Sequence, residues 1–156
     1  MRRVVVTGFG ILSPVGSGKK HFFDALAAGR SAIRRLADSS ADDVCPKLGA
    51  ELTFDPLAHL SRRKIAELDR TTQISLVAVR EALSDAGLVL TGPDGDRCGT
   101  YWGTGMGSTH TIESSYGGMF SDPQYRIRPA TIVMSMNNSA AAQIAIDFGI
   151  RGPGLT

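Results

Sequence analysis

Two short apolar runs, each followed closely by glycine, predict buried strands. The first is Val4–Val6, which precedes Gly8 and Gly10, and the second is residues 97–103, which lead into Gly103–Gly107. Continuous apolar runs bounded by glycine are typical of strands that are covered on both faces, as in parallel sheets. The pattern therefore predicts two buried strands separated by about ninety residues of other structure.

Helical periodicity, with apolar residues at every third or fourth position, predicts three helices ahead of the last one. They start after Ser17, Ser61 and Ser108, and the first two stop at Gly29 and Gly87. A serine can cap a helix N-terminus, and glycine readily adopts the left-handed conformation that ends a helix.

The last predicted helix spans Met136–Phe148 and is rich in serine and alanine, which is typical of a helix that approaches a neighbouring backbone closely. Residues 34–60 are broken by prolines and a glycine, so we expect a surface excursion there with a short strand near Leu48–Thr53. Strands alternating with helices predict an α/β domain over residues 1–156 with a mainly parallel sheet.

Composition narrows the class of protein. The 156 residues are 42% hydrophobic and 21% charged, which is typical of a soluble globular chain and not of a disordered one. No apolar run approaches the roughly 18 residues of a membrane span, and the N-terminus does not resemble a signal peptide. A net charge of +2 is too small to indicate nucleic acid as a partner. We therefore expect a cytoplasmic protein that binds neither membrane nor nucleic acid.

The cysteines and histidines show no pattern of a metal centre or a disulfide framework. Cys45 and Cys98 are interpreted as structural thiols, because free cysteine behaves as a small hydrophobic residue. His21, His59 and His110 are far apart in the sequence and have no cysteine or carboxylate at metal-ligand spacing, so we interpret them as surface or core residues.

Two nucleotide-binding motifs were considered for the N-terminal region and disfavoured. A dinucleotide fingerprint needs a third glycine where this chain has Ser13, and a phosphate loop needs serine or threonine where it has Lys20.

Six segments in order along the chain carry a resemblance to a known family. They are Arg3–Gly16, Phe23–Ile33, the pair Leu68–Gln73 and Ala82–Leu88, Gly103–Gly107, Arg128–Asn138, and Ile144–Thr156. Together they resemble the β-ketoacyl-acyl-carrier-protein synthases of the elongating, type II branch. The resemblance implies the N-terminal half of a thiolase-like αβαβα fold, truncated before the nucleophile strand is complete.

The same resemblance implies a decarboxylative Claisen condensation between acyl groups and malonyl-carrier protein, in fatty acid or polyketide biosynthesis. In the family an activated cysteine takes the acyl group and two histidines assist decarboxylation, with no metal or nucleotide cofactor. Those residues would follow Thr156, so we expect no catalytic residue in this chain and no activity from the chain alone. The full protein is expected to be a homodimer that acts on malonyl- and acyl-thioester substrates.

The resemblance also places two residues at the acyl pocket. Met106, within the glycine-rich turn, matches a pocket-lining position, and its flexible thioether suits a wall that adapts to different chains. Thr131 matches a position that reaches across the dimer interface toward the end of the partner's acyl pocket. Because threonine is small where some relatives have an aromatic residue, the hypothesis is a roomier pocket.

A basic surface is the second predicted site. Arg62, Arg63, Lys64 and Arg126 are interpreted as docking residues for acyl carrier protein, an acidic partner. Glu67 departs from the family pattern, because relatives often carry a base there. The alternative is that these charges simply form a solvated helix face.

Other functional classes remain open at this point. One is a non-catalytic subunit that resembles the chain-length factors, and another is a carrier-binding or dimerisation module complete at Thr156. A Rossmann oxidoreductase is a more distant alternative.

Overall fold

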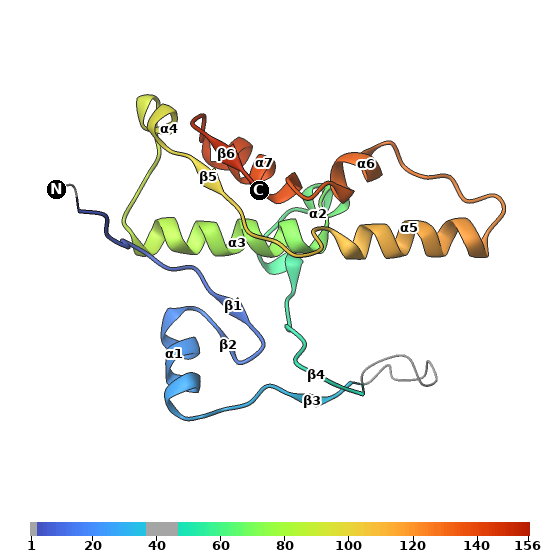
Figure 1. Ribbon diagram of the computed structural model, residues 1–156, viewed down its shortest axis with the longest axis horizontal. Coiled ribbons are helices and arrows are strands. Elements are labelled where there is room, and N and C mark those ends of the chain that lie inside the picture. Colours follow the sequence, from blue (N-terminus) through green and yellow to red (C-terminus); the bar gives the residue numbers. More distant parts are fainter. Residues whose placement is uncertain (1–2, 37–46) are drawn as a thin grey trace.

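The computed structural model describes residues 3–36 and 47–156, so Cys45 lies outside the described residues. Two long helices, α3 (Arg70–Asp85) and α5 (Thr109–Ser121), run along the longest axis in Figure 1. The N-terminal elements lie on one side of α3, and the elements at the C-terminal end lie on the other. No helix in the described ranges is long and apolar enough to cross a membrane.

The N-terminal part is built from small antiparallel pairs around one short helix. Strands β1 (Leu12–Ser13) and β2 (Gly16–Ser17) form a hairpin, and α1 (Lys19–Ala27) follows at once. Strand β3 (Arg34–Arg35) then pairs with β4 (Leu48–Gly49), which confirms a short strand at the start of the predicted range 48–53.

The prediction that Ser17 caps the first helix was wrong. Gly18 occupies the N-cap position with φ 81°, and no side chain caps this helix, because Ser17 is already paired in β2. The predicted stop at Gly29 is confirmed, since the helix ends at Ala27 and Gly29 has the left-handed φ of 63°.

The predicted N-terminal strand is also not buried. Val4, Val5 and Val6 are 97%, 68% and 75% exposed, and in the described part of the chain no strand pairs with them. The glycines that follow do pack closely, since a Cβ at Gly8 or Gly10 would collide with backbone of α3. An apolar run is buried only where neighbouring strands and a covering layer exist, and those are not among the described elements.

The helical pattern predicted from Ser61 divides into two helices. After the single turn η1 (Pro56–Ala58), Ser61 caps α2 (Arg62–Glu67) by accepting a hydrogen bond from the Lys64 N–H at 3.3 Å. The chain then becomes extended at Leu68 and Asp69, because the Asp69 carboxylate caps α3 and starts a new helix. The stop at Gly87 is confirmed by its φ of 63°.

Strand β5 (Thr100–Tyr101) is shorter than the predicted run 97–103, and it begins after the short helix α4 (Pro93–Arg97). It pairs in parallel with β6 (Gly154–Leu155). Cys98 ends α4 as a partly buried free thiol and is not in a strand. The predicted α/β class is confirmed, but two of the three strand pairs in the described ranges, β1–β2 and β3–β4, are antiparallel. In the first pair the reason is the two-residue turn that joins the strands, since such a turn permits antiparallel pairing only.

The core lies between α3 and α7 (Ser139–Phe148), which also packs against β5 and β6. Ala140 and Ala141 are buried there, which confirms the predicted close approach of the small-residue helix. The helix starts at Ser139 rather than at Met136, because a separate helix α6 (Ala130–Ser135) precedes it and Met136 is extended. The central apolar cluster consists of Leu68, Leu76 and Ile144, with Val79, Trp102, Phe148 and Ile150 packed around it.

Candidate functional site

The glycine-rich turn between β5 and α5 is fixed by one hydrogen bond within the turn and by contacts with two other segments. The Thr104 hydroxyl accepts a hydrogen bond from the Gly107 N–H at 3.1 Å, and the Thr71 hydroxyl donates to the Gly107 carbonyl at 3.4 Å. Gly107 has φ 62°, and a Cβ there would collide with the Asn137 side chain. The predicted close approach therefore holds at Gly107 but not at Gly103 or Gly105, where a Cβ would meet nothing within 4 Å.

The two predicted pocket residues have opposite environments. Met106 projects from the turn and is 77% exposed, whereas Thr131, in the first turn of α6, is 9% exposed. Thr131 is held by its N–H, which donates to the Arg128 carbonyl at 2.9 Å. The Met106 side chain is therefore accessible to a ligand or to another part of the protein, whereas the Thr131 side chain is packed against its neighbours.

A depression of about 490 Å³ lies beside the last residue of the chain. Its walls are Thr104 of the glycine-rich turn, the loop residues Met136, Asn137 and Asn138, and Thr156 itself. Strand β6 is held in this place by parallel pairing, in which the Trp102 N–H donates to the Leu155 carbonyl at 2.9 Å. The turn, the Asn137 loop and the C-terminal residue therefore meet at one place.

A buried carboxylate, which the sequence did not single out, joins the two long helices at their N-termini. Asp69 is 1% exposed and accepts from the Thr71 N–H at 2.8 Å, from the Thr111 N–H at 2.9 Å and from the Thr111 hydroxyl at 2.6 Å. An aspartate at an N-cap was detectable as a pattern, but its bond to Thr111, 42 positions away, was not.

The predicted docking arginines lie on the surface. Arg62, Arg63 and Arg126 are exposed, and the Arg63 Nε is 3.0 Å from a carboxylate oxygen of Glu67, one turn along α2. The loop that carries Arg126 reaches the same helix, because Arg128 donates to the Ala66 carbonyl at 3.3 Å. Arg126 therefore lies on a loop that is held against the helix carrying Arg62 and Arg63.

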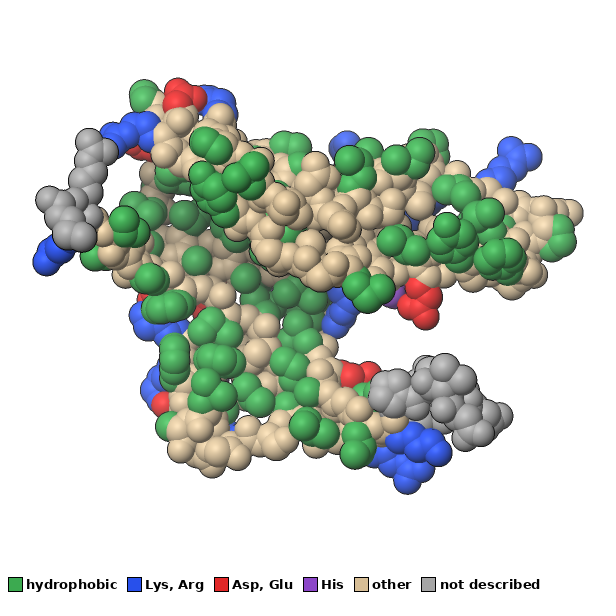
Figure 2. All heavy atoms as spheres, in the orientation of Figure 1, with side chains coloured by type: hydrophobic (Ala, Val, Ile, Leu, Met, Phe, Trp, Pro, Cys, Tyr) green, Lys and Arg blue, Asp and Glu red, His purple; other side chains and the backbone are tan. Residues whose placement is uncertain are grey.

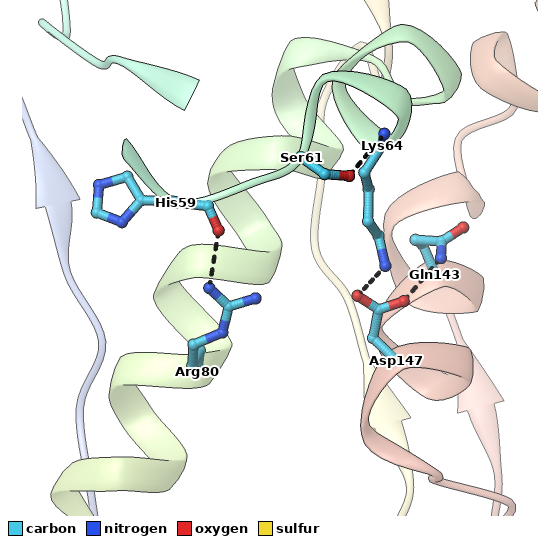
Figure 3. A network of polar contacts seen from close by, with 6 residues as sticks. All are labelled: His59, Ser61, Lys64, Arg80, Gln143 and Asp147. Carbon is cyan, nitrogen blue, oxygen red and sulfur yellow. Dashed lines mark hydrogen bonds and ion pairs between the residues drawn. The ribbon is translucent and has the colours of Figure 1, made fainter. Parts of the chain in front are cut away.

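Lys64, the fourth predicted docking residue, points in another direction. Figure 3 shows its ammonium group paired with Asp147 of α7, and the other oxygen of Asp147 accepts from the Gln143 side chain at 2.9 Å. The Lys64 side chain is 30% exposed and that of Asp147 is 13% exposed. In the same view Arg80 of α3 donates to the His59 carbonyl at 3.2 Å, which ties the segment before α2 to α3.

Side-chain hydrogen bonds from Arg151 hold the segment between α7 and β6 against α4. Arg151 donates to Asp96 of α4 at 2.6 Å and to the Gly92 carbonyl at 2.8 Å. The hydrogen bond from Arg151 is the main reason why the pKa of Asp96 lies below its ordinary value of 3.8.

The two larger cavities lie elsewhere. One, of about 670 Å³, opens between the N-terminal segment and α3, and the other, of about 710 Å³, lies between α3 and α7. Neither is lined by Met106, Thr131 or a predicted docking residue. The volume of a cavity therefore does not indicate where the predicted site residues lie. Within residues 3–36 and 47–156, no group of three or more histidine, cysteine or acidic side chains could hold a metal ion.

Comparison with known families decides the class of this chain. The sequence model of the family described as "Beta-ketoacyl synthase, N-terminal domain" matches residues 1–156. The chain belongs to the β-ketoacyl synthase family. The resemblance predicted from the six sequence segments is therefore confirmed over the whole chain.

Two curated relatives match the chain over nearly its whole length. A putative polyketide β-ketoacyl synthase 1 of Streptomyces halstedii is 38% identical over 97% of this chain, and a 3-oxoacyl-[acyl-carrier-protein] synthase 2 of Staphylococcus aureus (strain N315) is 31% identical over 97%. This chain covers 38% and 37% of those relatives, so it spans well under half of their length.

Solved structures confirm the predicted thiolase-like fold of the β-ketoacyl synthases. A β-ketoacyl synthase from Burkholderia phymatum STM815 superposes with a TM-score of 0.80 at 27% identity, covering 99% of this chain and 39% of that one. The ishigamide ketosynthase/chain length factor superposes with a TM-score of 0.82 at 28% identity, again covering 99% and 39%. The described elements are thus the N-terminal part of that fold.

Proposed function

We propose that the protein carrying this chain is a 3-oxoacyl-[acyl-carrier-protein] synthase, an acyltransferase that condenses an acyl group with a malonyl group held on acyl carrier protein. The observation that carries the proposal is the match of the family model to every residue of the chain. The polyketide and fatty acid relatives both support thioester substrates presented by a carrier.

The chain contributes scaffold and walls to this reaction. The parallel pair β5–β6 brings Thr156 beside the glycine-rich turn, so the strand that continues from Thr156 would enter the depression lined by Thr104 and Asn137. A cysteine in that region would form the acyl thioester, and histidines from the rest of the protein would assist decarboxylation. Met106 would line the acyl pocket, and Thr131 would shape its far end.

The exposed basic residues would receive the carrier protein. Arg62 and Arg63 lie on α2, and Arg126 lies on the loop that Arg128 joins to the same helix. Complementary charge attracts an acidic partner and speeds its encounter. We further propose a homodimer, since α5 and α6 expose the apolar side chains Tyr116, Met119, Phe120, Ile132 and Val133. A cytoplasmic location is proposed with it, on the composition of the chain.

A condensation assay on the full-length protein tests the proposal. With acyl-carrier and malonyl-carrier protein as substrates, we expect a 3-oxoacyl-carrier product, two carbons longer than the acyl group supplied, detected by mass spectrometry. Carrier lacking the malonyl group is the control and should give none. Absence of product from folded protein that binds both carriers would contradict the proposed activity.

A second function is favoured by one observation. The ishigamide protein, which resembles this chain at a TM-score of 0.82, is described as a ketosynthase/chain length factor pair. A non-catalytic subunit would share every element described here and would differ at the nucleophile position. Restoration of condensation on mixing with a separate active synthase would identify that role.

A further inference from the structure

Lys64 differs from the neighbouring arginines in what its charge contacts. Arg62 and Arg63 are exposed, whereas the Lys64 ammonium is paired with Asp147, 83 positions later in the chain (Figure 3). Asp147 is itself held by Gln143 at 2.9 Å. A charge already paired in a half-buried site is not free to attract a partner at a distance.

The helix that carries the docking arginines needs such ties. Helix α2 has only six residues, and helices so short are not stable in water without tertiary contacts. Its other contacts of this kind are single hydrogen bonds. The Lys64 N–H donates to the Ser61 hydroxyl, the Gln73 side chain donates to the Ile65 carbonyl, and the Arg128 side chain donates to the Ala66 carbonyl. The contact between Lys64 and Asp147 is therefore the only side-chain ion pair recorded between α2 and another element in the described residues.

The partner helix is the one that leads into β6. Helix α7 packs against α3, β5 and β6, and Gly149 ends it five residues before β6 begins. An ion pair between α2 and α7 thus connects the docking arginines to the helix that sets the position of Thr156.

We propose that Lys64 is a positioning residue and not a docking contact: its ion pair with Asp147 holds α2 against α7 so that Arg62 and Arg63 face the carrier protein. This inference rests on the proposed function, because it concerns the orientation of the proposed carrier-docking surface.

The two roles of Lys64 predict opposite effects of Asp147→Asn on the affinity for the carrier protein. Asp147→Asn makes the protein one unit more positive, so electrostatic attraction alone would leave the affinity for an acidic carrier unchanged or raise it. If Asp147 instead holds α2 through Lys64, the same substitution lowers the affinity. Glu67→Gln is the matched control, since it also removes one acid but leaves the pair between Lys64 and Asp147 intact.

The test measures the affinity of full-length variants for acyl carrier protein by fluorescence anisotropy at low and at moderate salt. We expect Lys64→Met and Asp147→Asn each to weaken binding by about 3- to 10-fold, and the double variant to be no weaker than either single variant. Lys64→Arg should restore binding, and Glu67→Gln should bind at least as tightly as the unmodified protein. Lys64→Met should keep the original salt dependence, because it removes no docking charge.

Other outcomes overturn the proposal. Weaker binding by Lys64→Met together with unchanged or tighter binding by Asp147→Asn would make Lys64 a docking contact. Unchanged binding by both would show that the ion pair does not orient α2. Circular dichroism of each variant identifies any that has lost its fold, and the comparison of folded Asp147→Asn with Glu67→Gln then decides between the roles.

Failure of the proposed docking surface gives a separate result. The double reversal Arg63→Glu with Arg126→Glu should weaken carrier binding. The matched reversal of Arg30, which follows α1, and Arg97, at the end of α4, to glutamate should weaken it less. Equal effects of the two reversals at low salt would overturn the docking surface itself, whatever Lys64 does.

Discussion

At the scale of single residues, the buried carboxylate of Asp69 has the strongest structural effect. It satisfies backbone N–H groups at the starts of two helices, α3 and α5, and it has almost no access to water. Removing a partner from buried N–H groups costs their full desolvation energy, which is more than the net gain of making the bonds.

The first prediction concerns this residue. Asp69→Ala should lower the free energy of unfolding of the full-length protein by about 3 kcal/mol, the sum of a lost cap and a second orphaned donor. Thr111→Val removes only the hydroxyl bond and should cost about 1 kcal/mol. Urea denaturation measures both values, and an Asp69→Ala protein as stable as the original would contradict this role.

Thr131 carries the second prediction at this scale. Filling its position with Thr131→Phe should shorten the longest acyl chain that the full-length protein accepts, because the residue is proposed to border the end of the acyl pocket. Thr131→Val, which keeps the size, should leave that limit unchanged. Chain-length profiling with carrier-bound acyl groups measures it, and an identical limit in a folded Thr131→Phe protein would rule out the role.

Among the helices and strands, local sequence signals predicted where helices begin and end better than they predicted which segments are buried. Ser61 and Gly87 could be identified because capping and left-handed glycine are properties of a few neighbouring residues. The exposure of Val4–Val6 could not, because burial of a strand depends on partners far away in the sequence. At the split of one helical pattern at Asp69, the cap on the Thr71 N–H is local, whereas the bonds to Thr111 join residues far apart in the sequence.

The candidate site shows the same division. Its residue types were visible in the sequence, since Met106 lies in a glycine-rich turn and the arginines form a cluster. Their surroundings were not, because the pairing of Lys64 with Asp147 joins residues that only the tertiary fold brings together. Sequence therefore indicated which residues to consider, and the fold separated the exposed arginines from a lysine that is paired with another helix.

The contact between Arg151 and Asp96, which joins α4 to the segment before β6, should make the stability of the protein depend on pH. The hydrogen bond from Arg151 keeps the pKa of Asp96 below its ordinary value of 3.8 in the folded protein. The pair therefore stabilises the fold above about pH 3.8, and this stabilisation is lost as the pH falls through the lower folded pKa.

Asp96→Asn should consequently lower the melting temperature at neutral pH, and the difference from the unmodified protein should shrink under acid conditions. Melting curves between pH 3 and pH 7 measure this. Asp94→Asn, in the same helix but bonded only to Thr91, is the control. A difference for Asp96→Asn that is independent of pH would contradict the ionic origin of the tie.

At the scale of the whole molecule, this chain exposes much apolar surface. Hydrophobic side chains gather over α5 and α6 in Figure 2, where Phe120 is 84% exposed and Ile132 is 71% exposed. Another exposed apolar residue, Ile146, lies on α7 with 72% exposure. Large apolar patches on a soluble protein are interaction surfaces or causes of aggregation.

We therefore expect the 156-residue chain to associate or aggregate when it is produced alone. Light scattering should report species heavier than the 16.5 kDa monomer, and calorimetry should show no single cooperative transition. A monodisperse monomer with a cooperative transition would contradict this expectation. Addition of the rest of the protein should suppress association if it covers these surfaces.

The synthase proposed above would take an acyl group onto itself before condensation. Intact-protein mass spectrometry after incubation with acyl-carrier protein tests it most directly. We expect one added acyl group per subunit, removable by hydroxylamine as expected of a thioester. Carrier binding at the docking surface without any acyl adduct would contradict the claim and favour a non-catalytic subunit.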